Sequence, residues 1–202
     1  GVYPSTISRW ELNENAPQKP NRRSLKKYLR EQGIPIDVIL AGVFLLKLLN
    51  KYDKSTLDHS YRVALLSYAI GQEMRMAPDL TMNFACLLHD IGKIAVPIAI
   101  LKKTDPLTAG ERDILNEHPR YSGLLLQGFF DHDPEVAAIA AGHHPPRVAG
   151  SRYQFSCPEE VPENVRILIV CDVFEAMTAW RDYKDQVTVE KSIADLRCYP
   201  AI

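Results

Sequence analysis

Several histidine and aspartate side chains lie in or beside apolar segments of this sequence, and such side chains can bind metal ions. The stretch CLLHDIGKIAVP, residues 86–97, places His89, Asp90 and Lys93 directly after an apolar run. Asp172 lies within VRILIVCDVFEAMTAW, where a carboxylate costs several kcal/mol unless it is paired, hydrogen-bonded or bound to a metal. We therefore expect cationic groups to face Asp172.

Seven such groups on four or five helices of one small domain favour a shared metal site. A single histidine or aspartate of this kind is more often a hydrogen-bonded structural residue, but independent structural explanations would have to coincide seven times. Nitrogen and oxygen ligands without thiolates suit iron, manganese, zinc or nickel, and a carboxylate between histidines suits two metals. Asp90, with two oxygens, is the expected bridge. The candidate ligands are His59, His89, Asp90, His118, His143, His144 and Asp172. His132, in the polar stretch DHDP, is expected to face solvent.

The elements that must position these groups are predicted to be helices. Apolar residues recur at three- and four-residue spacings after Pro35, and no pair of alternating strands flanks a hairpin turn. We expect an all-α domain with helices over residues 36–52, 56–76, 78–88, 109–127, 134–142, 161–181 and 187–198. Residues 165–173 are rich in valine and isoleucine, but the length of the apolar segment favours a helix over a strand. On this pattern His118 lies toward the middle of a helix, and the His143–His144 pair ends one before Pro145.

Composition is that of a globular protein with one substantial core. The chain has 202 residues, of which 46% are hydrophobic, and its 24 basic and 25 acidic residues nearly balance. The apolar stretch 38–46 is too short to span a bilayer, so no membrane contact is expected. No signal peptide precedes it, and Cys86, Cys157, Cys171 and Cys198 are scattered, which favours the cytoplasm. Because the sequence lacks an initial methionine and ends early, we expect it to be a fragment.

Residues 1–33 are more basic than the rest of the chain. We expect them to form a separate segment before a domain over residues 34–202. They hold seven basic and three acidic residues, a local net charge of +4. Pro17 and Pro20 bracket a polar loop, and Gly33-Ile34-Pro35 closes the segment.

The series of His59, His89-Asp90, His118, His143-His144 and Asp172 resembles the HD phosphohydrolase superfamily from about Leu48 to Leu196. Several segments resemble its HD-GYP branch in order and spacing. They are HDIGKIAVP, ILKK followed by LT, EHP, HHPP and DVFEAMTAWRDYK. This resemblance implies a helical HD-domain bundle with two metals buried between helices. In the Gly-Tyr-Pro loop this chain reads RVAGSRYQF, with Arg152 and Gln154 in place of glycine and proline. Ser55 stands where some relatives carry a ligand for a third metal, so two metals are expected.

The resemblance implies a phosphodiesterase that opens a cyclic dinucleotide, chiefly cyclic di-GMP, in bacterial second-messenger signalling or transcription regulation. Two divalent ions held by Asp90, iron or manganese first and zinc, nickel or magnesium as alternatives, would activate a shared water as hydroxide. Lys93 would neutralise a phosphate oxygen or assist the leaving group. The expected substrate-binding residues are Lys93, Arg181 and Lys184, followed by Lys103, Arg147 and Arg152. Two alternatives stay open: hydrolysis of another nucleotide, and a sensor that binds a cyclic dinucleotide without turnover and reports to a DNA-binding domain.

The stretch GVYPSTISRWE resembles the turn and recognition helix of a lambda-repressor-type helix-turn-helix, and RRSLKKYLREQGI resembles the helix that follows. The residues expected to face DNA in the full-length protein are Ser5, Thr6, Ser8 and Arg9. The alternative is an amphipathic arm that packs on the HD domain or on a second subunit, and a homodimer is a further candidate assembly.

Overall fold

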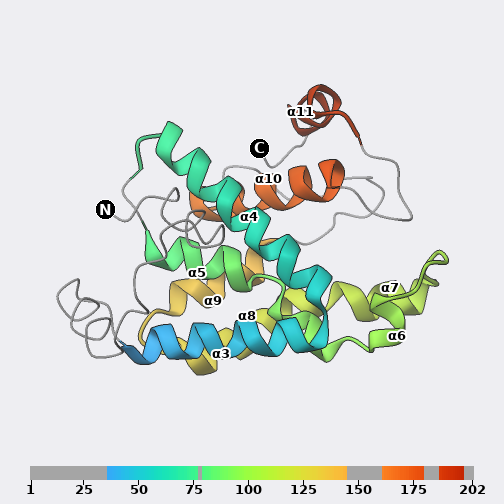
Figure 1. Cartoon of the computed structure of the whole chain (residues 1–202), viewed down its shortest axis with the longest axis horizontal. Helices are drawn as coiled ribbons and strands as arrows, with labels where there is room; N and C mark the ends of the chain where they lie inside the picture. The colour runs from blue at the N-terminus through green and yellow to red at the C-terminus, as the bar shows by residue number, and fades with distance from the viewer. Residues whose placement is uncertain (1–35, 77–78, 145–160, 180–186, 198–202) are drawn as a thin grey trace, which may run out of the picture. The chain divides into compact units, whose positions relative to one another are not determined.

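The computed structural model describes residues 36–76, 79–144, 161–179 and 187–197. Every element in these ranges is a helix (Figure 1), which confirms the predicted all-α class. The chain divides into two units, Gly1–Leu40 and Ala41–Ile202, and only Ile36–Leu40 of the first is described. The predictions for Ser5, Thr6, Ser8 and Arg9 lie outside the described residues. The elements are α3 (Ile36–Tyr52), α4 (Lys54–Glu73), α5 (Leu80–Leu88), η1 (Ile91–Ala95), α6 (Ile98–Leu101), α7 (Ala109–Asn116), α8 (His118–Phe129), α9 (Pro134–Gly142), α10 (Glu163–Thr178) and α11 (Val189–Arg197).

Helix starts follow from local capping chemistry. The side chain of Asp53 accepts a hydrogen bond from the backbone N–H of Thr56 at 3.0 Å, so α4 begins at Lys54. Asp79 caps α5 in the same way. Thr108 and Glu111 form a reciprocal capping box at the start of α7. The valine-rich segment 165–173 lies within α10, as its length predicted.

The single helix predicted over residues 109–127 is wrong, because the structure ends α7 at Asn116 and begins α8 at His118. Pro119 explains the break, since proline lacks an N–H and its ring clashes with the carbonyl four residues earlier in a continuous helix. That carbonyl, of Leu115, accepts a hydrogen bond from Nδ1 of His118 at 2.6 Å. His118 is therefore the first residue of a helix and not a mid-helix residue. The short elements η1 and α6 were not predicted either.

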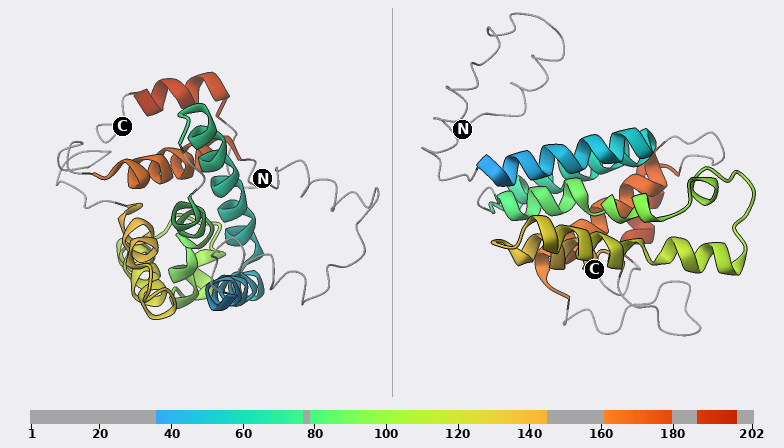
Figure 2. Two further views of the ribbon diagram at one scale, coloured as in Figure 1. Left: turned by 90° about the vertical axis from the view of Figure 1, so that its left-hand side faces the viewer. Right: turned by 90° about the horizontal axis from the view of Figure 1, so that it is seen from below.

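The helix α5 lies in the middle of the bundle, where it packs against α4 and α9 (Figure 2). The helix α8 packs against α9 and η1, and α10 packs against α4, α9 and α11. Phe130, Leu88, Ile91, Leu126 and Leu168 are among the fully buried side chains. The His89-Asp90 dipeptide thus leaves α5 at the centre of the hydrophobic core.

Gly92 permits the close approach of η1 to α8. Its N–H donates a hydrogen bond to the Ser122 hydroxyl at 2.8 Å, and a Cβ at this position would lie 2.1 Å from the backbone carbonyl oxygen of His118. No side chain fits in that space. The glycine therefore holds the loop that carries Asp90 directly against the helix that begins with His118.

None of the described helices has the length and apolar character needed to cross a membrane.

Cys86 and Cys171 are buried free thiols, and burial raises the pKa of Cys86 to about 12. Such a thiol stays protonated and unreactive at neutral pH. Cys157 and Cys198 lie outside the described residues.

Candidate metal centre

The structure brings all seven predicted ligands together from five helices. His59 comes from α4, the His89-Asp90 pair follows α5, and His118 begins α8. The His143-His144 pair follows α9, and Asp172 comes from α10. Three overlapping groups have ligand atoms within 4.8 Å of one another: His59, His89 and Asp172; His118, His143 and His144; and His89, Asp90 and His143.

Asp90 is shared between two sets of imidazoles. Its Oδ1 lies 3.0 Å from Nε2 of His118 and 3.7 Å from Nε2 of His143. Its Oδ2 lies 3.5 Å from Nε2 of His89 and 3.7 Å from Nε2 of His59. Each carboxylate oxygen therefore faces one pair of histidines, which is the arrangement of a bridging carboxylate.

Asp172 is the second carboxylate of the centre. Its Oδ1 lies 2.9 Å from Nε2 of His59 and 3.8 Å from Nε2 of His89, and its Oδ2 lies 3.5 Å from Nε2 of His144. Of these imidazoles, His59 is the cationic group that was expected to face this carboxylate, because its pKa is raised to about 9.

Three of the imidazoles are oriented by the backbone carbonyl three residues before them. Nδ1 of His89, His118 and His143 donates to the carbonyls of Cys86 at 2.8 Å, Leu115 at 2.6 Å and Ala140 at 2.5 Å. Because Nδ1 carries the proton in each ring, Nε2 presents a lone pair toward the two aspartates. The backbone at three helix ends thereby selects the tautomer that binds a metal.

These lone pairs can bind divalent cations, whereas two lone pairs that face each other repel. Nε2 of His118 and Nε2 of His143 lie 3.2 Å apart, and both are acceptors when Nδ1 is protonated. Nε2 of His89 is buried without a hydrogen-bond partner in the described structure. Buried acceptors that face acceptors are costly unless a cation lies between them. The donor set of imidazoles and carboxylates is that of iron, manganese, zinc or nickel.

His59 is oriented differently, by a residue that the sequence reasoning missed. Its Nδ1 donates to Oε2 of Glu175, which is 3% exposed, and Nε of Arg62 donates to Oε1 of the same carboxylate at 2.5 Å. A carboxylate behind a ligand histidine fixes the ring and raises its basicity. Glu175 lies three residues after Asp172 on one apolar helix, so the argument that singled out Asp172 applied to it as well.

The electrostatics keep both carboxylates ionised. Burial works to raise the pKa of Asp90, but the ammonium group of Lys93 beside it holds that pKa well below its usual value. The pKa of Asp172 is likewise low, because hydrogen bonds from His144 and His59 outweigh its burial.

Two of the imidazoles are held neutral, and one is not. Burial lowers the pKa of His143 to about 3 and also lowers the pKa of His89. Burial also works to lower the pKa of His59, but hydrogen bonds to Asp172 and Glu175 outweigh it and raise that pKa to about 9. In the metal-free protein His59 therefore carries the proton that a metal ion would displace.

Three of the seven candidate ligands line a cleft of about 550 Å³, together with two lysines: His59, His144, Asp172, Lys93 and Lys103. Nζ of Lys93 lies 2.5 Å from Oδ2 of Asp90. Lys103 is different, because its Nζ is held by both oxygens of Glu111 at 2.6 and 2.8 Å. The remaining predicted substrate residues, Arg147, Arg152, Arg181 and Lys184, lie outside the described residues.

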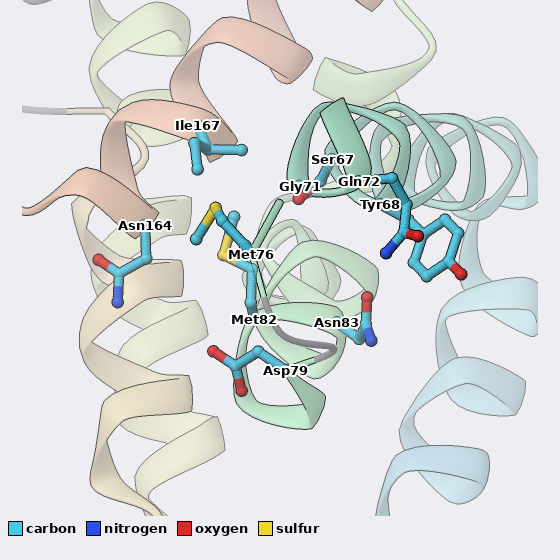
Figure 3. A pocket seen from close by; sticks show the side chains of 10 residues that line it. All are labelled: Ser67, Tyr68, Gly71, Gln72, Met76, Asp79, Met82, Asn83, Asn164 and Ile167. Atoms are coloured by element: carbon cyan, nitrogen blue, oxygen red, sulfur yellow. The ribbon is translucent and has the colours of Figure 1, made fainter. Parts of the chain in front are cut away.

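A second, smaller cavity lies between α4, α5 and α10, with Met76 and Met82 among its lining residues (Figure 3). Its volume is about 40 Å³, which is room for one or two water molecules. Asp79 is its only acidic lining residue among those described, and its carboxylate caps α5. The 550 Å³ cleft is thus the better candidate for a substrate site.

His132 is exposed beside Asp131, away from the metal centre, as predicted.

The HD domain family model matches residues 44–201. The cyclic di-GMP phosphodiesterase response regulator RpfG of Xanthomonas campestris is 37% identical over 57% of this chain and 31% of its own length. A cyclic di-GMP phosphodiesterase of Thermotoga maritima is 33% identical over 79% of this chain and 45% of its own length. A 3'3'-cGAMP-specific phosphodiesterase of Vibrio cholerae is 29% identical over 73% of this chain and 32% of its own length. The chain thus spans less than half the length of these relatives.

Among solved structures, the HD domain of the L. monocytogenes phosphodiesterase PgpH has the same fold. It matches with a TM-score of 0.61 and 24% identity over 76% of this chain and 82% of that domain. The same domain in complex with cyclic di-AMP matches with a TM-score of 0.59 and 23% identity, over 76% of this chain and 83% of that domain. With a family match that covers most of its residues, the chain belongs to the HD domain family.

Proposed function

We propose that this chain is the catalytic domain of a metal-dependent phosphodiesterase of the HD-GYP branch, and that it opens a cyclic dinucleotide. The observation that carries the proposal is the position of Asp90. Each of its two oxygens faces a pair of histidines at 3.0 to 3.7 Å, and His59 of one pair lines a cleft of about 550 Å³ together with Lys93. A shared carboxylate between two histidine sets supports a site for two metal ions.

His59, His89, Asp90 and Asp172 would hold one ion, and His118, His143, His144 and Asp90 would hold the other. Iron or manganese is our first choice, with zinc, nickel or magnesium as alternatives. When bound, such ions polarise a phosphoryl oxygen and make water a stronger nucleophile at neutral pH. Ser55 lines the same cleft in place of a carboxylate, which supports two metals over three.

The residues around the ions would position the phosphodiester and balance its charge. Hydrolysis adds one water molecule across one P–O bond. The water oxygen bonds to phosphorus, and the departing ribose oxygen takes a proton. Lys93 lies at this place with its ammonium group 2.5 Å from Asp90, where it would neutralise a phosphate oxygen or the leaving oxygen. Its side chain retains 22% exposure, which keeps it accessible to a substrate.

A cyclic dinucleotide is supported by the size of the cleft and by the relatives. Ligand pockets commonly measure about 300 to 1,000 Å³, and this cleft falls within that range. The relatives above act on cyclic di-GMP or 3'3'-cGAMP by their names, and cyclic di-GMP is our first candidate. Arg181 and Lys184, and then Arg147 and Arg152 in the altered Gly-Tyr-Pro loop, are proposed to bind phosphate from outside the described residues.

Residues 1–33 are proposed, from their sequence alone, to belong to a helix-turn-helix module of a longer protein. Salt-sensitive DNA binding by the full-length protein, absent from this 202-residue chain, would support that assignment. A full-length protein that does not bind DNA would contradict the helix-turn-helix assignment.

The test is to measure metals in anaerobically purified protein and then to follow products. The protein would be incubated with cyclic di-GMP, 3'3'-cGAMP and a simple aryl phosphodiester, with Asp90→Ala as the inactive control. We expect about two divalent ions per chain and a linear dinucleotide from cyclic di-GMP. Tight binding of cyclic di-GMP without product would favour the sensor, and faster hydrolysis of the aryl ester would remove the cyclic dinucleotide as substrate.

A further inference from the structure

The helix α3 has two apolar faces, and only one of them is buried in the bundle. Leu45 and Leu49 are at most 1% exposed, and Gly42 on the same face lies against the ring of Phe84. On the other face, large apolar side chains are open to solvent. Leu40 is 60% exposed, Phe44 is 55% exposed and Leu48 is 37% exposed. A row of large exposed apolar side chains commonly marks an interaction surface.

One stripe of the exposed face of α3 reads the same in both directions, and Val43, Lys47 and Asn50 are exposed beside it. Its residues are Asp37, Leu40, Phe44, Leu48 and Lys51, with intervals of three, four, four and three residues along one continuous helix. At about 100° per residue these positions fall within roughly 80° of the helix surface. Phe44 is the centre, two leucines flank it symmetrically, and an acid and a base occupy the two ends. Asp37 and Lys51 are both exposed.

Such a stripe is complementary to a second copy of itself. We propose that α3 pairs antiparallel with α3 of another chain, about a two-fold axis beside Phe44. In this register Leu40 faces Leu48 of the second copy, and Asp37 faces its Lys51 at both ends of the interface. A two-fold interface uses the same patch on both partners and pairs residue i with j and j with i. A parallel pairing would instead place Asp37 against Asp37 and Lys51 against Lys51, which repel.

The patch continues onto α8 through an aromatic contact. Phe129 is 40% exposed, and its ring centroid lies 6.1 Å from that of Phe44. Figure 2 shows α3 end-on at an outer corner of the bundle. Aromatic side chains at the centre of a patch commonly dominate its binding energy.

The proposed interface is small. A helix of 17 residues is about 25 Å long, so one helix pair buries less than a standard protein interface. We therefore expect a reversible dimer with a dissociation constant on the order of micromolar.

The first test measures the mass of the 202-residue chain by sedimentation equilibrium across concentration. The wild-type protein should pass from the 22.8 kDa chain mass to twice that mass. Phe44→Glu should raise the dissociation constant by about a hundredfold or more, because it buries two carboxylates at the axis. Leu65→Glu is the matched control, since Leu65 is 61% exposed on α4, outside the patch, and should change nothing. Circular dichroism checks that both variants fold.

The second test swaps the charges at the two ends of the stripe. Asp37→Lys and Lys51→Asp alone should each weaken the dimer by about tenfold, because each places like charges together at both ends. The double variant should recover wild-type affinity within about threefold, since the antiparallel pairs are restored with reversed sign. A double variant as weak as the single ones would overturn the antiparallel register.

Two other outcomes would overturn the dimer itself. A wild-type chain that stays monomeric up to about 100 µM would show that another segment or protein covers the stripe. A dimer that Phe44→Glu leaves intact would show that the chains associate elsewhere.

Discussion

Glu175 of α10 accepts a hydrogen bond from Nδ1 of His59 of α4, and Arg62 holds the second oxygen of the same carboxylate at 2.5 Å. Arg62 lies one helical turn after His59, so α4 supplies two groups that face this carboxylate. The ring of His59 is thereby fixed by another helix, whereas His89, His118 and His143 are fixed by their own backbone. The orientation of this ligand depends on how α4 and α10 pack together.

Glu175→Gln is expected to weaken metal binding by about 10- to 100-fold, the usual effect of removing a carboxylate behind a ligand histidine. The amide keeps the shape of the side chain but loses the charge that both His59 and Arg62 face. Metal titration of the apoprotein measures the effect. Arg62→Gln is the control, and it should cost less because Glu175 still accepts the His59 proton. Equal effects of the two changes would assign the role to the ion pair instead.

The same change should alter the pH dependence of stability in the metal-free protein. The pKa of His59 is raised from 6.5 to about 9, so its contribution to folding is present below pH 6.5 and disappears as the pH rises through 9. We expect the difference in unfolding free energy between wild type and Glu175→Gln to be largest near pH 6 and to shrink above about pH 9. Urea unfolding at several pH values measures it. A difference that stays constant with pH would show that His59 does not carry this proton.

Asp90→Ala is expected to abolish metal loading and hydrolysis together, because Asp90 contacts both histidine sets. His132→Ala should alter neither, since His132 is exposed beside Asp131 and contacts none of the ligands. Metal content and product formation from cyclic di-GMP are measured on both variants. If the two substitutions had similar effects, the assignment of the ligands would be wrong.

The convergence of the seven candidate ligands could be predicted from the sequence, because polar residues within apolar helices stand out there. Asp172 stands in a run of apolar residues, and the pair His143-His144 stands where a helix must end. Glu175 obeys the same rule, yet its role could not be read, because a carboxylate one turn from a ligand can cap, pair or ligate. Only the packing of α10 against α4 shows that it faces His59.

Helix boundaries at the site were harder to predict than helix existence. The apolar spacing runs on through residues 109–127, so periodicity alone favoured one helix. The signal that argued against it was Pro119, which makes His118 the first residue of α8. Gly92 carried no periodic signal at all, because its role depends on the distance between η1 and α8, which local sequence does not encode.

Gly92→Ala is expected to destabilise the fold by about 1 to 3 kcal/mol and to impair metal binding. The new Cβ would lie 2.1 Å from the His118 carbonyl oxygen, so η1 must move away from α8 and take Asp90 with it. Thermal unfolding and metal content report the two effects. Gly128→Ala in α8 is the matched control, since a Cβ there meets nothing within 4 Å and should be neutral or stabilising. Full metal content in Gly92→Ala would show that Asp90 does not depend on this contact.

Removal of metal is expected to lower the melting temperature. An ion present at a hundred times its dissociation constant stabilises the folded state by about 2.7 kcal/mol, which is roughly 5 to 10 °C for a chain of this size. Calorimetry with and without a chelator measures the shift. Asp90→Ala should show no such shift, because its binding sites are lost, whereas His132→Ala should show the full one. A chelator that leaves the wild-type melting temperature unchanged would contradict a metal held by these buried helices.

Glu111→Gln is expected to strengthen substrate binding by about two- to fivefold at low salt, because it frees the positive charge of Lys103 inside the cleft. In the present structure both oxygens of Glu111 hold Nζ of Lys103, which lines the same cleft as His59 and Asp172. Glutamine can still complete the capping box with Thr108, so α7 should keep its start. The KM for cyclic di-GMP is measured at low and high salt, and the gain should fade at high salt. Adding Lys103→Gln should cancel it; a gain that survives this second change would mean that Lys103 does not reach the phosphates.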